Sequence, residues 1–376
     1  MIDYDVLKLI WWLLIGILFI GFAVTDGFDL GICTMLPFIG RDDDERRIII
    51  NSIGPHWDGN QVWLITGGAA IFAAWPPVYA SAFSGLYFAL LLVLFALFLR
   101  PVGFEYRSKI DHPRWRQVWD WGLFTAGVVP SLIFGVAFGN LFLGLPFELD
   151  ADMRSYYLGS FWALLHPFAL LAGVVSVAML VMHGMAFLRL RSEGALQART
   201  LLVGRVAGLV LILTFAAAGV WVSGMNGMYL QTLPAAPQYS ILDKTVVVTA
   251  GGWFDNYGRH PWMIAAPALG FAGAAGLMLF IDRLPVLAFL CSTASVAGVI
   301  FTAGFSLFPF VMPSSVDLAS SLTLWDATSS HLVLSWMFWA SIVFLPLILA
   351  YTAWSYRVMW GRISHEQLRQ RGKYLY

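Results

Sequence analysis

Long apolar stretches alternate with short polar segments along most of the chain. A helix needs about 20 apolar residues to cross the roughly 30 Å hydrocarbon core of a bilayer, and stretches of that length recur throughout. Bounded by charges or by Pro and Gly clusters, they predict nine membrane-spanning helices near residues 8–36, 50–75, 78–99, 118–142, 161–188, 202–224, 262–281, 285–308 and 332–355. The start, "MIDYDVLK", lacks the basic region of a signal peptide, so we expect a first span rather than a cleaved leader. The pattern predicts an all-α integral membrane protein.

Basic residues fall in alternate loops, which indicates how these helices are oriented. Cytoplasmic loops of membrane proteins carry an excess of Lys and Arg. With the N-terminus outside, all but four of the 22 basic residues lie on the inside. The four exceptions are Lys8, Arg154, Lys244 and Arg259. We predict a periplasmic N-terminus, a cytoplasmic C-terminus and a long periplasmic loop at residues 225–261, all within a single transmembrane domain, residues 1–376.

The composition agrees with this class, because 59% of the residues are hydrophobic and only 12% are charged. Soluble domains carry about 25% charged residues. The formal net charge of +0 argues against a nucleic-acid partner. The two cysteines, Cys33 and Cys291, are too few for a disulfide framework and stand singly in apolar surroundings, so we do not expect them to bind a metal.

Three carboxylates interrupt the predicted helices, where an ionisable group costs at least about 2.5 kcal/mol. Asp26 and Asp29, in "GFAVTDGFDLG", are three residues apart and share a helical face. Asp58, in "GPHWDGNQVW", lies about eight residues from the inner end of the second predicted helix, roughly 12 Å deep at ~1.5 Å per residue; Gly54 and Pro55 predict a local break there. Their place in the inner half favours a proton entry route. In the alternative interpretation, these acids only accept hydrogen bonds between helices or pair with an arginine of an inner loop.

Two of the seven histidines, His56 and His183, lie well inside predicted helices. Haem iron can take histidine as an axial ligand, but no pair of helices offers matched inward-facing histidines. We therefore expect both to be hydrogen-bonded structural histidines and predict no metal site in this chain. His56 also lies on one helical side with Asn60 and Trp63, beside Asp58, so it is a candidate for the proton path.

Several long motifs resemble subunit II of cytochrome bd ubiquinol oxidase. They are "WWLLIGILFIGFAVTDGFDLG", "ERRIIINSIGPHWDGNQVWLITGGAAIFAAWP", "RPVGFEYRSKI", "FGVAFGNL" and "LFPFVMPSS" with "SLTLWDATSS", and the similarity continues to the final "GRISHEQLRQRGKYLY". The resemblance implies nine helices, arranged as two four-helix bundles plus one peripheral helix. It also implies a complex of the bacterial inner membrane that oxidises quinol and reduces dioxygen to water with cytoplasmic protons, building a proton-motive force.

For this chain, the resemblance implies a supporting role in that complex. Two haems b and haem d, with the site of quinol oxidation, are expected on subunit I, the partner chain. Single-helix accessory subunits and membrane lipids are further expected partners, and some family members hold a structural ubiquinone in subunit II. Asp58 matches the proton-path carboxylate, whereas Trp57 and Trp63 match the region near the oxygen entry. Asp26 and Asp29 belong to the matched first-helix motif without an assigned individual role.

Two other functions fit the same residues. A secondary transporter could use Asp26, Asp29 and Asp58 for proton coupling, but such folds often show an inverted repeat and helices broken at the membrane midplane. No sharp repeat is visible here, and the three acids lie in the inner half. The second alternative is a purely structural partner with inert buried acids. Replacing Asp58 with Asn separates these hypotheses, because the proton-path hypothesis predicts retained haem and reduced oxygen consumption.

Overall fold

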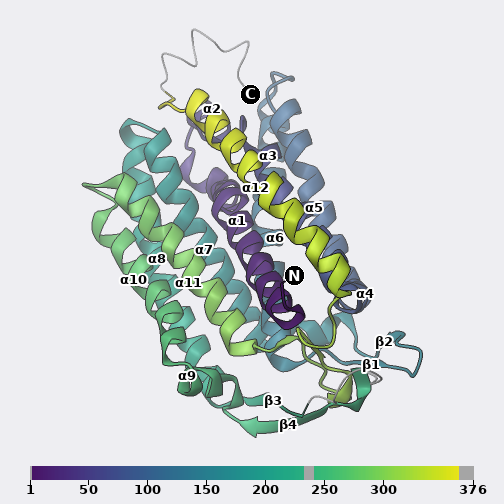
Figure 1. The fold of residues 1–376 in the computed structure, drawn as a ribbon. Helices are drawn as coiled ribbons and strands as arrows, with labels where there is room; N and C mark the ends of the chain where they lie inside the picture. The colour runs from purple at the N-terminus through teal and green to yellow at the C-terminus, as the bar shows by residue number, and fades with distance from the viewer. Residues whose placement is uncertain (1, 233–240, 364–376) are drawn as a thin grey trace.

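The computed structural model describes residues 2–232 and 241–363, most of which are helical (Figure 1). The helices are α1 (Tyr4–Ile39), α2 (Asp43–Ile53), α3 (Trp57–Ala74), α4 (Pro76–Gly85), α5 (Tyr87–Tyr106), α6 (Pro113–Leu143), α7 (Pro167–Arg191), α8 (Gly194–Ser223), α9 (Asp255–Arg259), α10 (Ala265–Phe280), α11 (Pro285–Leu307) and α12 (His331–Val358). Short antiparallel strands pair within the loops: β1 (Phe147–Leu149) with β2 (Ser155–Tyr157), β3 (Asn226–Thr232) with β4 (Thr245–Ala250), and β5 (Phe310–Met312) with β6 (Leu322–Thr323). The predicted helical class is confirmed.

Eight helical segments of the described chain are long and apolar enough to cross a membrane. They are α1, α5, α6, α7, α8, α11, α12 and the segment Pro261–Phe280, which ends in α10. The single predicted helix at 50–75 is wrong, because α2 ends at Ile53 and α3 begins only at Trp57. The predicted break at Gly54 and Pro55 is confirmed, as expected for a proline ring that cannot continue a helix. The count of nine spans stays a prediction.

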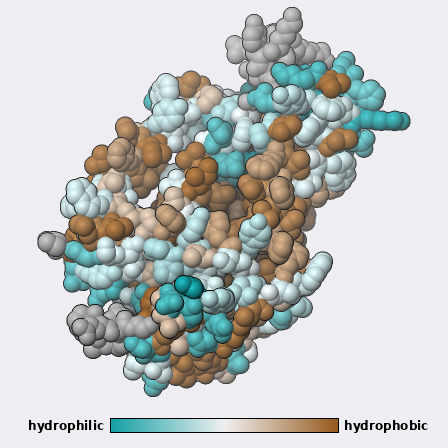
Figure 2. All heavy atoms as spheres, turned by 90° about the vertical axis from the view of Figure 1, so that its right-hand side faces the viewer, coloured by the Kyte–Doolittle hydropathy of each residue, from teal (hydrophilic) through white to brown (hydrophobic). Residues whose placement is uncertain are grey.

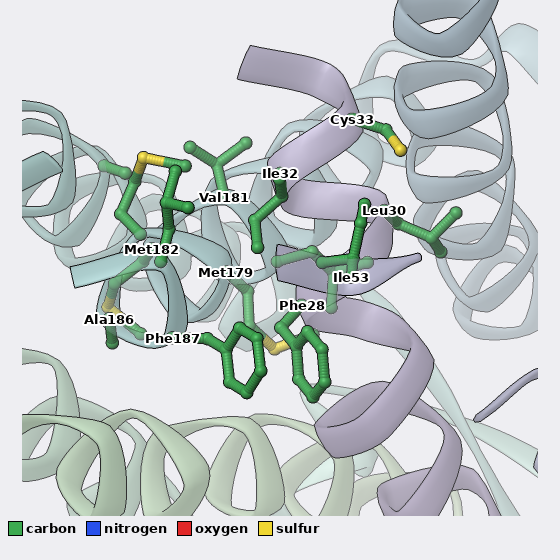
Figure 3. Close-up of a cluster of buried hydrophobic side chains, with 14 of the residues drawn as sticks. Phe28, Leu30, Ile32, Cys33, Ile53, Met179, Val181, Met182, Ala186 and Phe187 are labelled. Carbon is green, nitrogen blue, oxygen red and sulfur yellow. The ribbon is translucent and has the colours of Figure 1, made fainter. Parts of the chain in front are cut away.

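α1 is the central helix of the molecule and packs against α3, α6 and α7. The helices α8, α10 and α11 lie on one side of it and α5 lies on the other (Figure 1). The close approach of α1 and α7 requires a glycine, because a Cβ on Gly31 would lie 2.0 Å from the carbonyl oxygen of Leu180. One turn away, Phe28 stacks on Phe187 with 3.9 Å between ring centroids (Figure 3). These contacts hold α1 and α7 tightly together.

α12 is peripheral and is attached mainly at its two ends. Of its residues, all of them described, only Leu334 is buried. Near the start of the helix, the indole of Trp11 donates a hydrogen bond of 3.0 Å to the carbonyl oxygen of Leu334. Just past its other end, Arg191 donates one of 3.1 Å to the carbonyl oxygen of Met359. Every residue from 346 to 351 is exposed, which is more than one helical turn, so the middle of α12 is uncovered on all sides.

Apolar side chains gather in a band across one face of the molecule (Figure 2). Hydrophilic side chains lie beyond this band at both ends of the same face. This distribution suits a bilayer, in which the apolar band faces hydrocarbon and the polar ends face water.

The loops at one end form a cap that includes the β3–β4 hairpin, and α1 begins at this end (Figure 1). Lys244 Nζ lies 2.9 Å from Asp326 Oδ2, and both side chains are buried. Burial lowers the pKa of the Lys244 ammonium, and the Asp326 carboxylate opposes that shift. The cap contains the predicted periplasmic loop 225–261, except for residues 233–240, which lie outside the described residues. The predicted cytoplasmic tail beyond residue 363 also lies outside them, and the orientation in the membrane stays a prediction.

Candidate functional site

Arg100 and Asp26 form a buried ion pair between α5 and α1. Arg100 Nη1 lies 3.0 Å from Asp26 Oδ2, and Nη2 lies 2.6 Å from Asp26 Oδ1, so the contact is bidentate. Neither side chain is exposed to solvent. The predicted helix at 78–99 stops just before Arg100, whereas α5 includes Arg100 and continues to Tyr106. The pairing of Asp26 with an arginine, which the alternative interpretation predicts, is present, and a part for Asp26 in a proton path stays a prediction.

Asp29 lies in the same cluster but is held differently. Arg100 Nη2 lies 3.5 Å from Asp29 Oδ2, and Asn60 Nδ2 donates a hydrogen bond of 2.8 Å to the same oxygen. The other carboxylate oxygen, Oδ1, is buried and accepts a hydrogen bond from none of the described residues. The prediction that Asp26 and Asp29 share one helical face is confirmed, since both contact Arg100.

Asn60 connects this cluster to α12. The hydroxyl of Tyr356 donates a hydrogen bond of 2.6 Å to Asn60 Oδ1, and the His56 ring stacks on the Tyr356 ring at 4.1 Å with 3° between the planes. His56 Nε2 is buried without a hydrogen-bond partner in the described part of the chain. The Arg100 guanidinium carbon lies 5.6 Å from the ring centroid of Trp57. Asp29, Asn60 and Tyr356 therefore form a chain of hydrogen bonds that joins three helices.

Asp58 lies outside this cluster. It is in the first turn of α3, where its side chain is exposed on the surface of the chain. Gly59, Val62 and Ile65 are exposed on the same helix. The prediction of one continuous helix from residue 50 through Asp58 is wrong, because that helix is interrupted before α3, and the depth of Asp58 in the membrane stays a prediction. The helix N-terminus nonetheless favours a carboxylate at this position.

Trp63 packs closely against α1, where a Cβ on Gly21 would lie 2.5 Å from the indole. It is separated from Trp57 by nearly two helical turns, and both indoles are half-buried. The structure therefore places the two tryptophans predicted near the oxygen entry on one helix, at different heights.

A second ionic cluster, which sequence reasoning missed, joins α2, α5 and α6. Asp120 is buried and accepts hydrogen bonds from Arg107 Nε at 2.5 Å and from Arg46 Nη1 at 2.7 Å. Arg107 Nη2 also lies 3.0 Å from Asp43, which pairs with Arg116 at the same distance. In the sequence, these arginines indicate only that their segments lie on the cytoplasmic side. Their pairing with Asp43 and Asp120 is not visible there, because the paired residues are far apart along the chain. The cluster fixes α2 across the ends of two long helices.

His183 is a structural histidine, as predicted. Its Nδ1 lies 2.8 Å from Ser292 Oγ, and its Nε2 lies 2.9 Å from the carbonyl oxygen of Val24, so both ring nitrogens are engaged. The described residues contain no group of three or more His, Cys, Asp or Glu side chains that could hold a metal ion. Cys33 is buried and Cys291 is half-buried, and neither forms a disulfide.

A large apolar cavity of about 1580 Å³ lies among the helices and is lined almost wholly by aliphatic and aromatic side chains. Its wall includes Phe22 of α1, Leu64 of α3 and Phe134 of α6, and it extends to Phe215 of α8. Tyr257 contributes a rare polar group, and its hydroxyl lies 3.0 Å from Ser306 Oγ. The cavity can hold a long apolar molecule.

Comparisons with known proteins agree over nearly the whole chain. A family model described as cytochrome bd terminal oxidase subunit II matches residues 7–359. The chain is 53% identical over 380 residues to the cytochrome bd-I ubiquinol oxidase subunit 2 of Escherichia coli (strain K12), with 100% of both proteins covered. It is 35% identical over 362 residues to the cytochrome bd ubiquinol oxidase subunit 2 of Bacillus subtilis (strain 168), covering 95% of this chain and 97% of that protein.

A solved structure of the bd oxidase from Geobacillus thermodenitrificans resembles the fold, with a TM-score of 0.64. The match covers 94% of this chain and 98% of the solved chain at 15% sequence identity, so it supports the arrangement of helices alone.

Proposed function

This chain belongs to the family of cytochrome bd terminal oxidase subunit II, and we propose that it carries cytoplasmic protons through Asp58 toward the oxygen-reducing site of its complex. It is a multi-pass protein of the bacterial inner membrane and a subunit of a quinol oxidase, in which subunit I is its partner. The complex uses haem cofactors, quinol and dioxygen.

The observation that carries the proposal is the exposure of Asp58 on α3. An ionisable side chain that faces lipid costs at least about 2.5 kcal/mol, so membrane proteins turn such groups toward a partner or water. The neighbouring Gly59 has open space around its Cα, which allows another helix to approach closely. We infer that subunit I covers this face of α3 and that Asp58 supplies protons at the boundary between the two chains.

The haems are best placed on subunit I. In this chain, both ring nitrogens of His183 are engaged, and the His56 ring is covered on one face by Tyr356. These two histidines therefore do not fit a pair of axial haem ligands. We propose that two haems b and haem d bind to subunit I and that this chain supports them from outside.

The apolar cavity supports two further proposals. It suits the isoprenoid tail of a structural ubiquinone, because its wall is almost wholly apolar. Trp63 lies on the same helix as the cavity residues Gln61 and Leu64, which supports an oxygen route that passes Trp57 and Trp63 into the cavity. Quinone extracted from the purified complex, measured per haem, tests the first proposal. Nine spans with a periplasmic N-terminus, single-helix accessory subunits and bound lipids complete the proposed complex.

The Asp58→Asn variant of the complex tests the proton path. We expect an unchanged haem spectrum and oxygen consumption reduced about tenfold or more, because Asn cannot exchange a proton. Glu105→Gln is the matched control, since Glu105 is also an exposed acid near an inner helix end, and it should keep full activity. Full activity of Asp58→Asn would contradict the proton path and leave a structural role for this chain.

A further inference from the structure

We propose that Tyr356 and Asn60 position Asp29 as the proton-exchanging carboxyl of the buried cluster, while Asp26 remains a fixed counter-ion of Arg100. This inference rests on the proposed function, in which the chain conducts protons for an oxidase. It adds a second carboxyl to that path and names the two residues that orient it.

The two buried acids differ in how many of their oxygens are occupied. Both oxygens of Asp26 accept hydrogen bonds from Arg100, so adding a proton there breaks a bidentate ion pair. Asp29 Oδ2 accepts from Asn60, with the guanidinium 3.5 Å away, and its Oδ1 has no donor among the described residues. A buried acceptor without a donor is costly, and a proton or a water molecule on that oxygen removes the cost. Asp29 can therefore take up a proton on Oδ1 without breaking a hydrogen bond, and only its longer, 3.5 Å contact with Arg100 is weakened.

Tyr356 determines which end of the Asn60 amide faces Asp29. An asparagine side chain carries an acceptor oxygen and a donor nitrogen that can exchange places when the amide turns over. The Tyr356 hydroxyl donates to Asn60 Oδ1 at 2.6 Å, which holds Nδ2 toward Asp29 at 2.8 Å. Without that hydroxyl, only Asp29 orients the amide, and the Asn60 oxygen can turn toward Asp29 whenever the carboxyl is protonated. The arrangement thus keeps a donor on one oxygen of Asp29 and leaves the other oxygen free.

Tyr356 is itself held in place from two sides. Its ring stacks on His56, and α12 is attached just beyond Tyr356, where Arg191 donates to Met359 and accepts a hydrogen bond of 3.0 Å from Ile363 N. Tyr356 is half-buried, so the chain of hydrogen bonds leads from near the surface to a fully buried acid.

The titratable and charged groups around Asp29 come from three helices. They are Asp26 and Cys33 on α1, Arg100 on α5 and Tyr356 on α12, with Arg191 acting on Tyr356 from α7. Arg100 is the cation nearest to Asp29, and the two acids share it, with the closer and bidentate contact going to Asp26.

The Tyr356→Phe variant of the whole complex tests the proposal, because it removes one hydroxyl and keeps the ring on His56. We expect an unchanged haem spectrum and a pH profile of oxygen consumption displaced by about half a pH unit to one unit, the size of one ordinary hydrogen bond such as that from Tyr356 to Asn60. Tyr351→Phe is the matched control: Tyr351 is exposed on the same helix, and its variant should follow the wild-type profile. Asn60→Ser should reproduce the displacement, since it breaks the same chain of hydrogen bonds from the other end.

A Tyr356→Phe profile that coincides with that of Tyr351→Phe overturns the positioning role. If Tyr356→Phe loses haem, the pH profile of Asn60→Ser tests the positioning role instead. Loss of haem in both variants assigns these residues a structural role and also overturns the positioning role. These outcomes are separate from the test of Asp58. An inactive Asp58→Asn with an unshifted Tyr356→Phe refutes only the positioning role, whereas an active Asp58→Asn refutes the proton path itself.

Discussion

Replacing Arg100 with Gln should destabilise the protein severely. The guanidinium makes two hydrogen bonds with Asp26, at 3.0 and 2.6 Å, and lies 3.5 Å from Asp29. All three side chains are fully buried, so the variant leaves two carboxylates close together without a counter-charge. Removing one partner of a buried ion pair costs about 3–5 kcal/mol. Because folded domains are stable by only about 5–15 kcal/mol, this is a large fraction of the total.

The assay is the retention of haem by the purified complex as the temperature rises. A loss of that size lowers the midpoint by roughly 6–20 °C in a domain of 150–250 residues. Arg114→Gln is the control, because it removes the same charge from an exposed position. The double variant Arg100→Gln with Asp26→Asn should recover part of the loss, since only Asp29 then stays without a counter-charge. A midpoint for Arg100→Gln equal to that of Arg114→Gln would refute the reasoning.

Two further predictions concern packing. Lys244→Met leaves the buried Asp326 in the cap without its counter-charge and should lower the free energy of unfolding by about 3–5 kcal/mol, which is measured as faster cleavage of the complex by protease. Adding Asp326→Leu should restore the resistance to protease. An unchanged cleavage rate in the single variant would contradict the prediction. Gly31→Ala places a Cβ 2.0 Å from the carbonyl oxygen of Leu180, so we expect it to force α1 and α7 apart and abolish the yield of haem-containing complex. Gly219→Ala, with open space around its Cα, should keep that yield, and equal yields would show that the helices tolerate the added methyl group.

The long helices could be predicted from the sequence because hydrocarbon imposes a minimum apolar length on each span. Two predicted helices are divided in the structure: the one at 50–75, where one apolar run holds the end of α2 and the start of α3, and the one at 78–99, which is split between α4 and α5. A run of apolar residues records where lipid lies, whereas a helix end depends on backbone hydrogen bonds. The break at Gly54 and Pro55 was therefore visible in the sequence, but the place of Asp58 in the first turn of a new helix was not.

The candidate site was predictable only in part. The spacing of Asp26 and Asp29 correctly predicts a shared face, because three residues make almost one helical turn. Their partner Arg100 looks like an inner-loop residue, since its charge follows a long apolar run, and its burial depends on acids more than 70 positions earlier. Tyr356 is further still from Asn60 along the chain, and nothing local to either residue predicts their contact. A polar residue on a helix also gives no sign of whether it faces the interior or a partner, so the exposure of Asp58 could not be predicted.

The uncovered middle of α12 offers a practical handle on this protein. Residues 346–351 contact little of their own chain, so a label there can report on a neighbouring subunit without disturbing the fold. The natural cysteines number only two, and Cys33 is buried, so a variant with Cys291 replaced would present almost no competing thiol. Single cysteines placed along this stretch would then allow the docking of the partner chain to be followed by fluorescence or cross-linking, one helical face at a time.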